Sequence, residues 1–267
     1  MDRTALVTGA SSGIGQATAA ALVAKGYRVV GTSRNPDAIE SSRRVGGVRY
    51  HRLDLEDDGS IEELGGAVGP VDVLVNNAGE SQSGPFEELP LDALRRLFQV
   101  NVLGQVRLAQ LVLPGMRERR WGRVVMVGSM LASFPLAYRS SYVASKAALR
   151  GFADGARHEY TPYNVYLSTV EPGSISTGIS ERRTTYVEDG SPFAGDFRRM
   201  LAALDRNERA GTPATRVAET IVKIVSASRP RGFYAVGSNA AVVFPLRRLL
   251  PAGLVSRATH RRHDLQR

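Results

Sequence analysis

The stretch that decides the fold reads Thr8-Gly9-Ala10-Ser11-Ser12-Gly13-Ile14-Gly15, and it joins an apolar run at residues 5–8 to a helical pattern. Gly9 permits a tight turn out of a strand, Gly13 lets the backbone approach a pyrophosphate, and Gly15 lets a helix pack close to the sheet. A helix that begins here directs unpaired N–H groups and a positive dipole end at the same spot. The stretch therefore predicts a dinucleotide-binding turn, and a Gly/Ser turn without a ligand is the alternative.

Apolar runs alternate with helical patterns along the rest of the chain. The runs are rich in valine and lack strict polar alternation, which is typical of strands buried on both faces of a parallel sheet. The expected strands are Ala5–Thr8, Arg28–Gly31, Val71–Val75, Arg123–Val127, Val165–Val170 and Arg231–Val236. The expected helices are Gly13–Lys25, Ser60–Val68, Leu91–Arg119, Ser140–Tyr160 and Pro213–Ser226. This order predicts an α/β fold, a doubly wound sheet with helices on both faces.

Two segments break the alternation. Residues 178–210 are rich in charged and small residues, so we expect a substrate-binding or partly disordered loop there. The prolines Pro245 and Pro251 and scattered arginines predict that the last dozen residues are loose. We therefore expect one domain over residues 1–240, including this loop, and a C-terminal extension over 241–267 with a basic, mobile tail.

The composition excludes several kinds of site. The chain has no cysteine, which excludes disulfides, thiolate metal clusters and thiol catalysis. Its four histidines show no metal-ligand spacing. His260 and His263 could pair as ligands, but a solvated tail is the favoured interpretation, and no metal site is predicted.

The net charge of +9 could indicate a nucleic-acid partner. Residues 247–267 hold six arginines and one aspartate, however, and no basic stripe is interleaved with aromatic residues. We therefore expect no nucleic-acid partner.

The sequence contains no recognisable signal peptide and no run of about 18 apolar residues, so a cytoplasmic protein without a transmembrane segment is expected.

Arg34 stands at the end of the second expected strand, in Gly31-Thr32-Ser33-Arg34-Asn35. A dinucleotide fold selective for NAD places an acid here, which accepts from the ribose 2′-hydroxyl. An acid would repel the 2′-phosphate of NADP, whereas a guanidinium suits it and can also stack on the adenine. The sequence predicts NADP(H) in preference to NAD(H), and a solvent-facing arginine is the alternative.

Tyr142 and Lys146 lie four residues apart on the helix expected over 140–160. This spacing places both side chains on one helix face, about one turn apart. A free phenol, with a pKa of about 10, is too weakly acidic to give an efficient base at neutral pH. A neighbouring ammonium group favours the phenolate and lowers this pKa. The pair is thus a candidate acid/base, although surface Tyr–Lys pairs also occur.

The chain resembles the short-chain dehydrogenase/reductase family, in its compact single-domain branch. The matching motifs run in family order from about Thr4 to Val236: Thr8-Gly9-x-x-x-Gly13-x-Gly15, Asp54 after the third strand, Asn76-Asn77-Ala78-Gly79, Asn101, Ser129, Tyr142-x-x-x-Lys146 and Pro172-Gly173-x-x-x-Thr177. Each motif alone is weak, but the ordered set is specific. The resemblance implies a Rossmann-type, mostly parallel seven-stranded sheet and hydride transfer between a nicotinamide and a carbonyl or alcohol.

The resemblance also implies four catalytic residues. Tyr142 is expected to donate a proton to the carbonyl oxygen in reduction and to take one from the alcohol in oxidation. Lys146 is expected to favour the phenolate and to bond the nicotinamide ribose. Ser129 is expected to bond the substrate oxygen, and Asn101 to hold a water that links Lys146 to solvent. The structural alternatives are a turn residue for Ser129 and a polar helix-interior residue for Asn101.

The remaining matched residues are expected to seat the cofactor and orient it. Asp54 and Leu55 border the adenine, Asn76 ties adjacent strands together, and Ile175 and Thr177 hold the nicotinamide. The full expected set is Thr8, Gly9, Ser11, Ser12, Gly13, Ile14, Gly15, Arg34, Asp54, Leu55, Asn76, Asn77, Ala78, Gly79, Tyr142, Lys146, Pro172, Gly173, Ile175 and Thr177.

The substrate side is less well defined. Three stretches are expected to line it: residues 80–83, 130–138 and 178–209. Their apolar side chains favour a hydrophobic small molecule, although several could merely pack the loop down. The expected contacts are Leu131, Phe134, Tyr138, Val187 and Phe193.

Residues 240–255 mix apolar residues with arginines and two prolines, so they could cap the pocket, form a subunit contact or rest on a membrane surface. The resemblance implies a homodimer or homotetramer packed through the helices at 91–119 and 140–160. A non-catalytic NADP-binding regulator on the same fold is the alternative function. Such proteins often lack the tyrosine or the lysine, whereas this chain has both.

Overall fold

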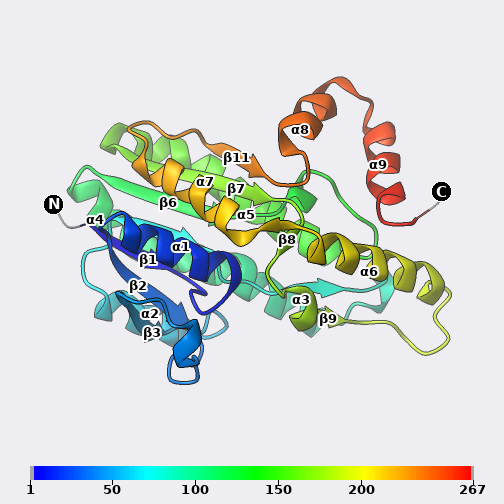
Figure 1. Cartoon of the computed structure of the whole chain (residues 1–267), viewed down its shortest axis with the longest axis horizontal. Helices are drawn as coiled ribbons and strands as arrows, with labels where there is room; N and C mark the ends of the chain where they lie inside the picture. Colours follow the sequence, from blue (N-terminus) through cyan, green and yellow to red (C-terminus); the bar gives the residue numbers. More distant parts are fainter. Residues whose placement is uncertain (1–2, 266–267) are drawn as a thin grey trace.

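The computed structural model describes residues 3–265, and within them one parallel sheet of seven strands forms the centre of the molecule (Figure 1). Its strands are β1 (Thr4–Val7), β2 (Arg28–Ser33), β3 (Val48–Arg52), β4 (Val73–Asn76), β6 (Gly122–Val127), β7 (Val165–Pro172) and β11 (Phe233–Val236). The strand order is β11-β7-β6-β4-β1-β2-β3, and each neighbouring pair is parallel. The predicted Rossmann-type α/β fold is confirmed.

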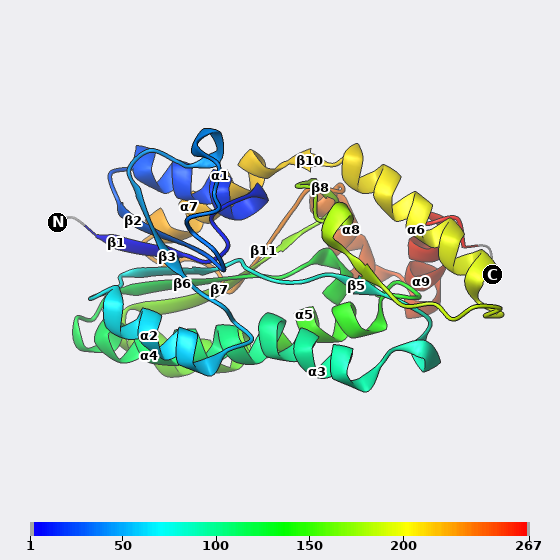
Figure 2. The same ribbon diagram turned by 90° about the horizontal axis from the view of Figure 1, so that it is seen from below.

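Helices cover both faces of the sheet (Figure 2). The helices on one face are α1 (Gly13–Ala24) and α7 (Ala214–Ser226), and those on the other are α2 (Asp58–Ala67), α4 (Gly104–Glu118) and α5 (Ser140–Tyr160). Two buried apolar clusters fill these layers, and β1 contributes to both. Ala5 and Val7 pack in the cluster with α1 and α7, whereas Leu6 packs in the cluster with α4 and α5, because successive strand residues point to opposite faces.

The strand order reverses between β1 and β4, and ligands of doubly wound sheets bind at such a switch point. Hydrogen bonds fix the turn after β1 to the loop after β4. The main-chain N–H of Thr8 donates to the carbonyl of Val75 over 3.0 Å, and its hydroxyl oxygen accepts from the N–H groups of Asn77 and Ala78 over 2.9 Å each. Two distant stretches of sequence therefore form one wall at the carboxyl ends of the strands.

The helix expected over 91–119 is interrupted in its first half. It consists of α3 (Leu91–Phe98), a π-helical turn at Gln99–Leu103, and α4. Single π-helical turns inside α-helices are frequent at functional sites. Asn101 lies in this turn and is fully buried.

The segment expected as a loop at 178–210 contains a helix, α6 (Ala194–Arg209). Phe197, Met200 and Leu204 recur at helical spacing, and they pack against Leu136 and Leu265. The many charged residues between them cover the exposed face, which concealed the helical period in the composition. The short strands β8 (Ile175–Ser176), β9 (Thr184–Thr185) and β10 (Thr212–Pro213) also lie in this part of the chain.

The C-terminal extension, expected to end in a loose tail, forms α8 (Ala240–Leu249) and α9 (Ala252–Arg261) instead. Pro251 is the N-cap residue of α9, a position where its missing N–H costs nothing. After α9, His263 and Leu265 are buried, so the chain stays packed against the body up to the last described residue. Residues 266 and 267, which fall within the expected tail, lie outside the described residues.

Gly15→Ala should destabilise the protein because α1 approaches the β1 turn very closely. A Cβ atom at Gly15 would lie 2.2 Å from the carbonyl oxygen of Gly9 and 2.5 Å from Nδ2 of Asn77. We expect the free energy of unfolding, measured by urea denaturation, to fall by about 2 kcal/mol or more. The matched control is Gly66→Ala in α2, where an added Cβ meets nothing within 4 Å. It should raise stability by up to about 1 kcal/mol, and similar effects in both variants would contradict the close packing of α1.

Candidate functional site

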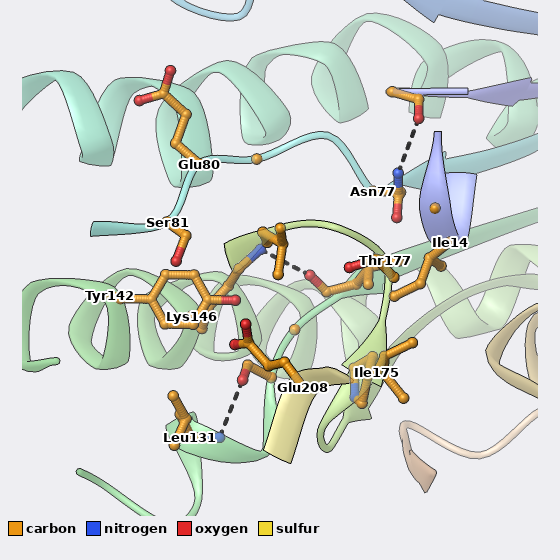
Figure 3. Close-up of a pocket in the computed structure, with 18 of the residues that line it drawn as sticks. Ile14, Asn77, Glu80, Ser81, Leu131, Tyr142, Lys146, Ile175, Thr177 and Glu208 are labelled. Carbon is orange, nitrogen blue, oxygen red and sulfur yellow. Dashed lines mark hydrogen bonds between the residues drawn. The ribbon is translucent and has the colours of Figure 1, made fainter. Parts of the chain in front are cut away.

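A cavity of about 900 Å³ opens at the carboxyl ends of the strands (Figure 3). It brings together most of the residues that the sequence motifs singled out, from seven separate stretches of the chain. The predicted residues that line it are Gly9, Ser11, Ser12, Gly13, Ile14, Arg34, Asp54, Leu55, Asn77, Ala78, Gly79, Ser129, Leu131, Phe134, Tyr142, Lys146, Pro172, Gly173, Ile175 and Thr177.

Four predicted residues, Thr8, Gly15, Asn76 and Asn101, lie behind this lining and hold it in place. Nδ2 of Asn76 donates to the carbonyl of Gln105 over 2.9 Å, which ties β4 to α4. The side-chain oxygen of Asn101 accepts from the N–H of Glu80 over 2.8 Å, and its Nδ2 donates to the carbonyl of Glu80 over 3.0 Å. Asn101 therefore fixes the chain where it leaves the loop after β4.

Three predicted substrate contacts are not among the lining residues. The ring of Tyr138 packs edge-on against Phe197, with centroids 5.8 Å apart, beneath α6. Val187 is exposed, and Phe193 is the N-cap residue of α6. The remaining apolar lining comes from α6 and the C-terminal helices. Leu204 lies in the expected stretch 178–209, and Val243, Leu246, Leu250 and Val255 lie in residues 240–255, for which capping of the pocket was one of the expected roles.

One end of the cavity is suited to phosphate groups. Ser12 is the N-cap residue of α1 and makes no side-chain capping hydrogen bond, so the first N–H groups of the helix face the cavity with their dipole. Gly13 has φ +54°, and a Cβ there would lie 3.0 Å from Cβ of Thr177. Only glycine leaves this approach open, so the turn fits the close binding of a pyrophosphate.

Basic residues line the neighbouring part of the cavity. Arg34 follows β2 directly and makes no ion pair within residues 3–265. Arg43, which the sequence analysis did not single out, lines the same cavity from a 3-10 turn at Ser41–Arg43, and Glu40 adds one carboxylate beside them. Asp54, which lies just after β3, lines the cavity as well, so two guanidinium groups and two carboxylates face this part of it.

Tyr142 and Lys146 lie on the buried side of α5, one turn apart, and both reach into the cavity (Figure 3). Nζ of Lys146 donates to the carbonyl of Val127 over 3.1 Å and lies 5.9 Å from the centroid of the Tyr142 ring. Within the described part of the chain, no carboxylate pairs with this ammonium group. Burial lowers the pKa of Lys146 to about 8.

Ser129 faces the same phenol from the loop after β6. Its hydroxyl oxygen accepts from the N–H of Leu131 over 3.2 Å, which leaves the hydroxyl proton to donate elsewhere. Burial raises the pKa of the Tyr142 phenol above its usual value, while the Arg139 guanidinium and hydrogen bonding from Ser129 act to lower it. The sequence analysis expected Lys146 to lower this pKa, but burial outweighs the charges around the phenol.

Arg139 is a residue of this site that the sequence analysis missed. Its guanidinium carbon lies 4.3 Å from the centroid of the Tyr142 ring, and the residue is buried. Nη1 donates to the Ser81 hydroxyl over 3.0 Å, to the Gln82 carbonyl over 2.9 Å and to the Ser83 hydroxyl over 2.9 Å. The three-residue spacing from Tyr142, at the start of a helix, was the signal in the sequence.

The Arg139 guanidinium also has an unused donor. Its Nε is buried and has no hydrogen-bond partner among the described residues. Burial lowers the pKa of Arg139 to about 10, so the group remains a cation at neutral pH. A second buried cation therefore adjoins the phenol ring.

The substrate end also contains one paired carboxylate. Arg183 is buried and bonds Asp205 over 2.5 Å and Glu208 over 2.6 Å. Glu208 reaches the cavity from the end of α6, opposite the side on which α5 presents Tyr142 (Figure 3). The pairing with Arg183 offsets the charge of Glu208 at the cavity wall, which Arg182, Arg262 and His263 also line.

Comparisons with known proteins agree on one family. A family model described as short chain dehydrogenase matches residues 3–187. The 3-ketodihydrosphingosine reductase of Bacteroides thetaiotaomicron is 32% identical over 245 residues, which cover 90% of this chain and 89% of that protein. Retinol dehydrogenase 8 of Homo sapiens is 34% identical over 247 residues, which cover 85% and 79%. The crystal structure of a short-chain dehydrogenase from Streptomyces avermitilis matches with a TM-score of 0.83 and 31% identity, covering 96% of each chain.

Proposed function

The chain is an oxidoreductase of the short-chain dehydrogenase family, and on that premise we propose that it transfers a hydride between NADP(H) and the carbonyl or alcohol of a hydrophobic small molecule. Tyr142 is its general acid/base. The observation that carries the proposal is the position of this buried phenol on the wall of the cavity that also contains the α1 N-terminus. Nζ of Lys146 lies 5.9 Å from the phenol ring centroid, and the guanidinium carbon of Arg139 lies 4.3 Å from it.

The cavity residues fit a dinucleotide along its length. The phosphates bind at the N-terminus of α1, and Lys146 has N–H donors beyond its bond to Val127 for ribose hydroxyls. Gly173 and Ser238 also line the cavity and pack tightly together, because a Cβ at Gly173 would lie 2.3 Å from the hydroxyl oxygen of Ser238. When bound, the nicotinamide supplies or accepts the hydride, and the chain provides orientation and electrostatics.

Side chains of the protein donate and accept the proton in this reaction. In reduction, the Tyr142 hydroxyl gives its proton to the carbonyl oxygen and becomes a phenolate; in oxidation, the phenolate takes the alcohol proton. Lys146 and Arg139 stabilise the phenolate, and they do so strongly because the site is buried. Once a substrate is bound, the Ser129 hydroxyl donates its single proton to the substrate oxygen instead of to the phenol, at the position where charge develops in the transition state.

Arg139 acts as a positioning residue for this chemistry. It bonds three groups at residues 81–83 while its guanidinium stacks on the Tyr142 ring, so it joins the loop after β4 to the start of α5. Stacking holds the ring, and with it the phenol hydroxyl, in one direction. The hydroxyl therefore need not be ordered during the reaction, which lowers the entropic cost of reaching the transition state. The positive charge of the same group favours the phenolate form.

The lining of the substrate end supports an apolar substrate. The apolar residues that line the cavity include Leu131, Phe134, Leu204, Val243 and Leu246. Two relatives carry the names 3-ketodihydrosphingosine reductase and retinol dehydrogenase 8, which supports a carbonyl or alcohol group on a largely apolar molecule. Mostly apolar pockets with few polar groups are typical of sites for such ligands.

We also propose a homo-oligomer packed through the layer that contains α4 and α5. The large apolar side chains of Leu103 and Phe152 are exposed on this layer, and a subunit contact would cover them.

The alternative function, a non-catalytic regulator, is disfavoured because the complete set of Ser129, Tyr142 and Lys146 lines one cavity.

Tyr142→Phe should abolish turnover and leave cofactor binding intact. Loss of the hydroxyl removes the proton donor, so NADPH oxidation with the best member of a panel of ketones and aldehydes should fall by about 10²- to 10⁴-fold. NADPH affinity, followed by nicotinamide fluorescence, should change little. Retained turnover in the variant would contradict the assigned role, and NADPH binding without turnover in the wild type would favour the regulator.

Arg34→Asp should reverse the cofactor preference. Replacing a cation near the 2′-phosphate by an anion should weaken NADPH binding by about 10- to 100-fold and strengthen NADH binding. The matched control is Arg52→Asp, which makes the same charge change at an exposed strand end outside the cavity lining. If NADPH affinity falls equally in both variants, or does not fall in Arg34→Asp, Arg34 does not bind the 2′-phosphate.

A further inference from the structure

The hairpin formed by α8 and α9 is anchored at both ends and not in the middle (Figure 1). In the middle of α8, the Phe244 ring packs against Phe134 and Phe233, with centroids 5.1 Å apart in each pair. At the end of α9, Nε2 of His260 accepts from the N–H of Ala137 over 3.2 Å. Within residues 3–265, no hydrogen bond joins residues 249–255 to the body of the protein.

The turn between the two helices, which we call the hairpin tip, is apolar. It reads Leu249-Leu250-Pro251-Ala252-Gly253-Leu254, and each of its residues is exposed. Leu249 is 80% and Leu254 is 48% exposed, and neither lines the cavity. Val242, which is 57% exposed, lies seven residues before Leu249 and extends the same helix face. Apart from Leu250, which lines the cavity, these apolar side chains therefore lie on the outer surface.

The residues around the tip carry positive charge only. Residues 240–263 contain five arginines and neither aspartate nor glutamate. Arg247 lies over the Phe134 ring and Arg262 lines the cavity. The other three, Arg248, Arg257 and Arg261, are exposed and make no ion pair within the described chain.

We propose that the hairpin tip docks on an anionic lipid surface. Leu249 and Leu254 enter the boundary between headgroups and acyl chains, and Arg248, Arg257 and Arg261 contact the lipid phosphates. An exposed apolar stripe bordered by arginines is the pattern of segments that lie in a membrane interface. A second copy of the chain fits the tip poorly, because a symmetric contact would bring identical positive charges together.

The docking is peripheral, because no helix among residues 3–265 is long and apolar enough to cross a membrane. Leu246, Leu250 and Val255 of the same hairpin line the cavity. A docked tip would thus place the apolar end of the cavity next to the lipid, where an apolar substrate could enter. This last link rests on the proposed function, whereas the docking itself does not.

The direct test is co-sedimentation of the full chain with lipid vesicles, without cofactor or substrate. We expect binding to vesicles of phosphatidylcholine mixed with phosphatidylglycerol and much weaker binding to phosphatidylcholine alone. Raising the salt to about 1 M, where the Debye length is about 3 Å, should release most of the protein. Equal binding to both vesicles, or binding to neither, would overturn the proposal.

Variants separate the apolar and charged contributions. Leu249→Ser/Leu254→Ser should weaken binding to the anionic vesicles by about tenfold or more, whereas Phe86→Ser/Leu91→Ser removes comparably exposed apolar residues elsewhere and should not. Arg248→Gln/Arg257→Gln/Arg261→Gln should weaken it by about tenfold or more. The matched control for this triple variant is Arg117→Gln/Lys223→Gln/Arg229→Gln, which removes three exposed positive charges elsewhere on the protein.

Two further outcomes would overturn the docking. One is an equal loss of binding to the anionic vesicles in the control variants. The other is a change of oligomeric state in Leu249→Ser/Leu254→Ser, with no vesicle binding by the wild type, because the tip would then be a subunit contact. NADPH binding should be the same in the tip variants and the wild type. Because the vesicle assay involves no turnover, a failure of the proposed enzymatic activity would leave its result unchanged.

Discussion

The phenol of Tyr142 lies buried beside two buried cations, and neither cation is paired with a carboxylate in the described part of the chain. Burial disfavours charge on each of the three groups, which raises the pKa of Tyr142 and lowers those of Lys146 and Arg139 to about 8 and about 10. A phenolate at Tyr142 would offset part of the desolvation penalty of burying both cations. The site is therefore arranged to accept negative charge at the phenol oxygen and at nearby ligand atoms.

The surrounding fold keeps these groups in place through contacts between distant parts of the sequence. The loop after β4 is held on one side by Thr8 and on the other by Asn101 and Arg139. Gly79 lies in the middle of this loop, where a Cβ would come within 2.9 Å of the side-chain oxygen of Asn101. The glycine-rich turn before α1 and the wall with Tyr142 are therefore tied to one loop, whereas α6 and the C-terminal hairpin supply other parts of the cavity lining.

The sequence predicted those features that local chemistry determines. Valine-rich runs indicated strands buried on both faces, and the glycines at 9, 13 and 15 indicated a turn that only small residues permit. The sequence did not predict features that depend on tertiary contacts. Arg139 resembles a surface arginine until Ser81 and Ser83 are placed around it. Likewise, the charges of α6 and the two prolines, Pro245 in α8 and Pro251 before α9, concealed helices whose apolar faces find partners only in the folded chain. Val187 and Phe193 were therefore expected where Leu204 and Val243 line the cavity.

The pH dependence of alcohol oxidation in Arg139→Gln tests most directly whether cations control the phenol. Oxidation needs the phenolate, so the rate rises with pH through the pKa of Tyr142. A cation favours the phenolate, and its removal should move this rising limb to higher pH by about one unit. Arg139→Lys, which keeps the charge, should move it much less. If the limb stays in place in Arg139→Gln while the rate falls, the arginine is only structural, and the account of a phenol tuned by two buried cations is contradicted.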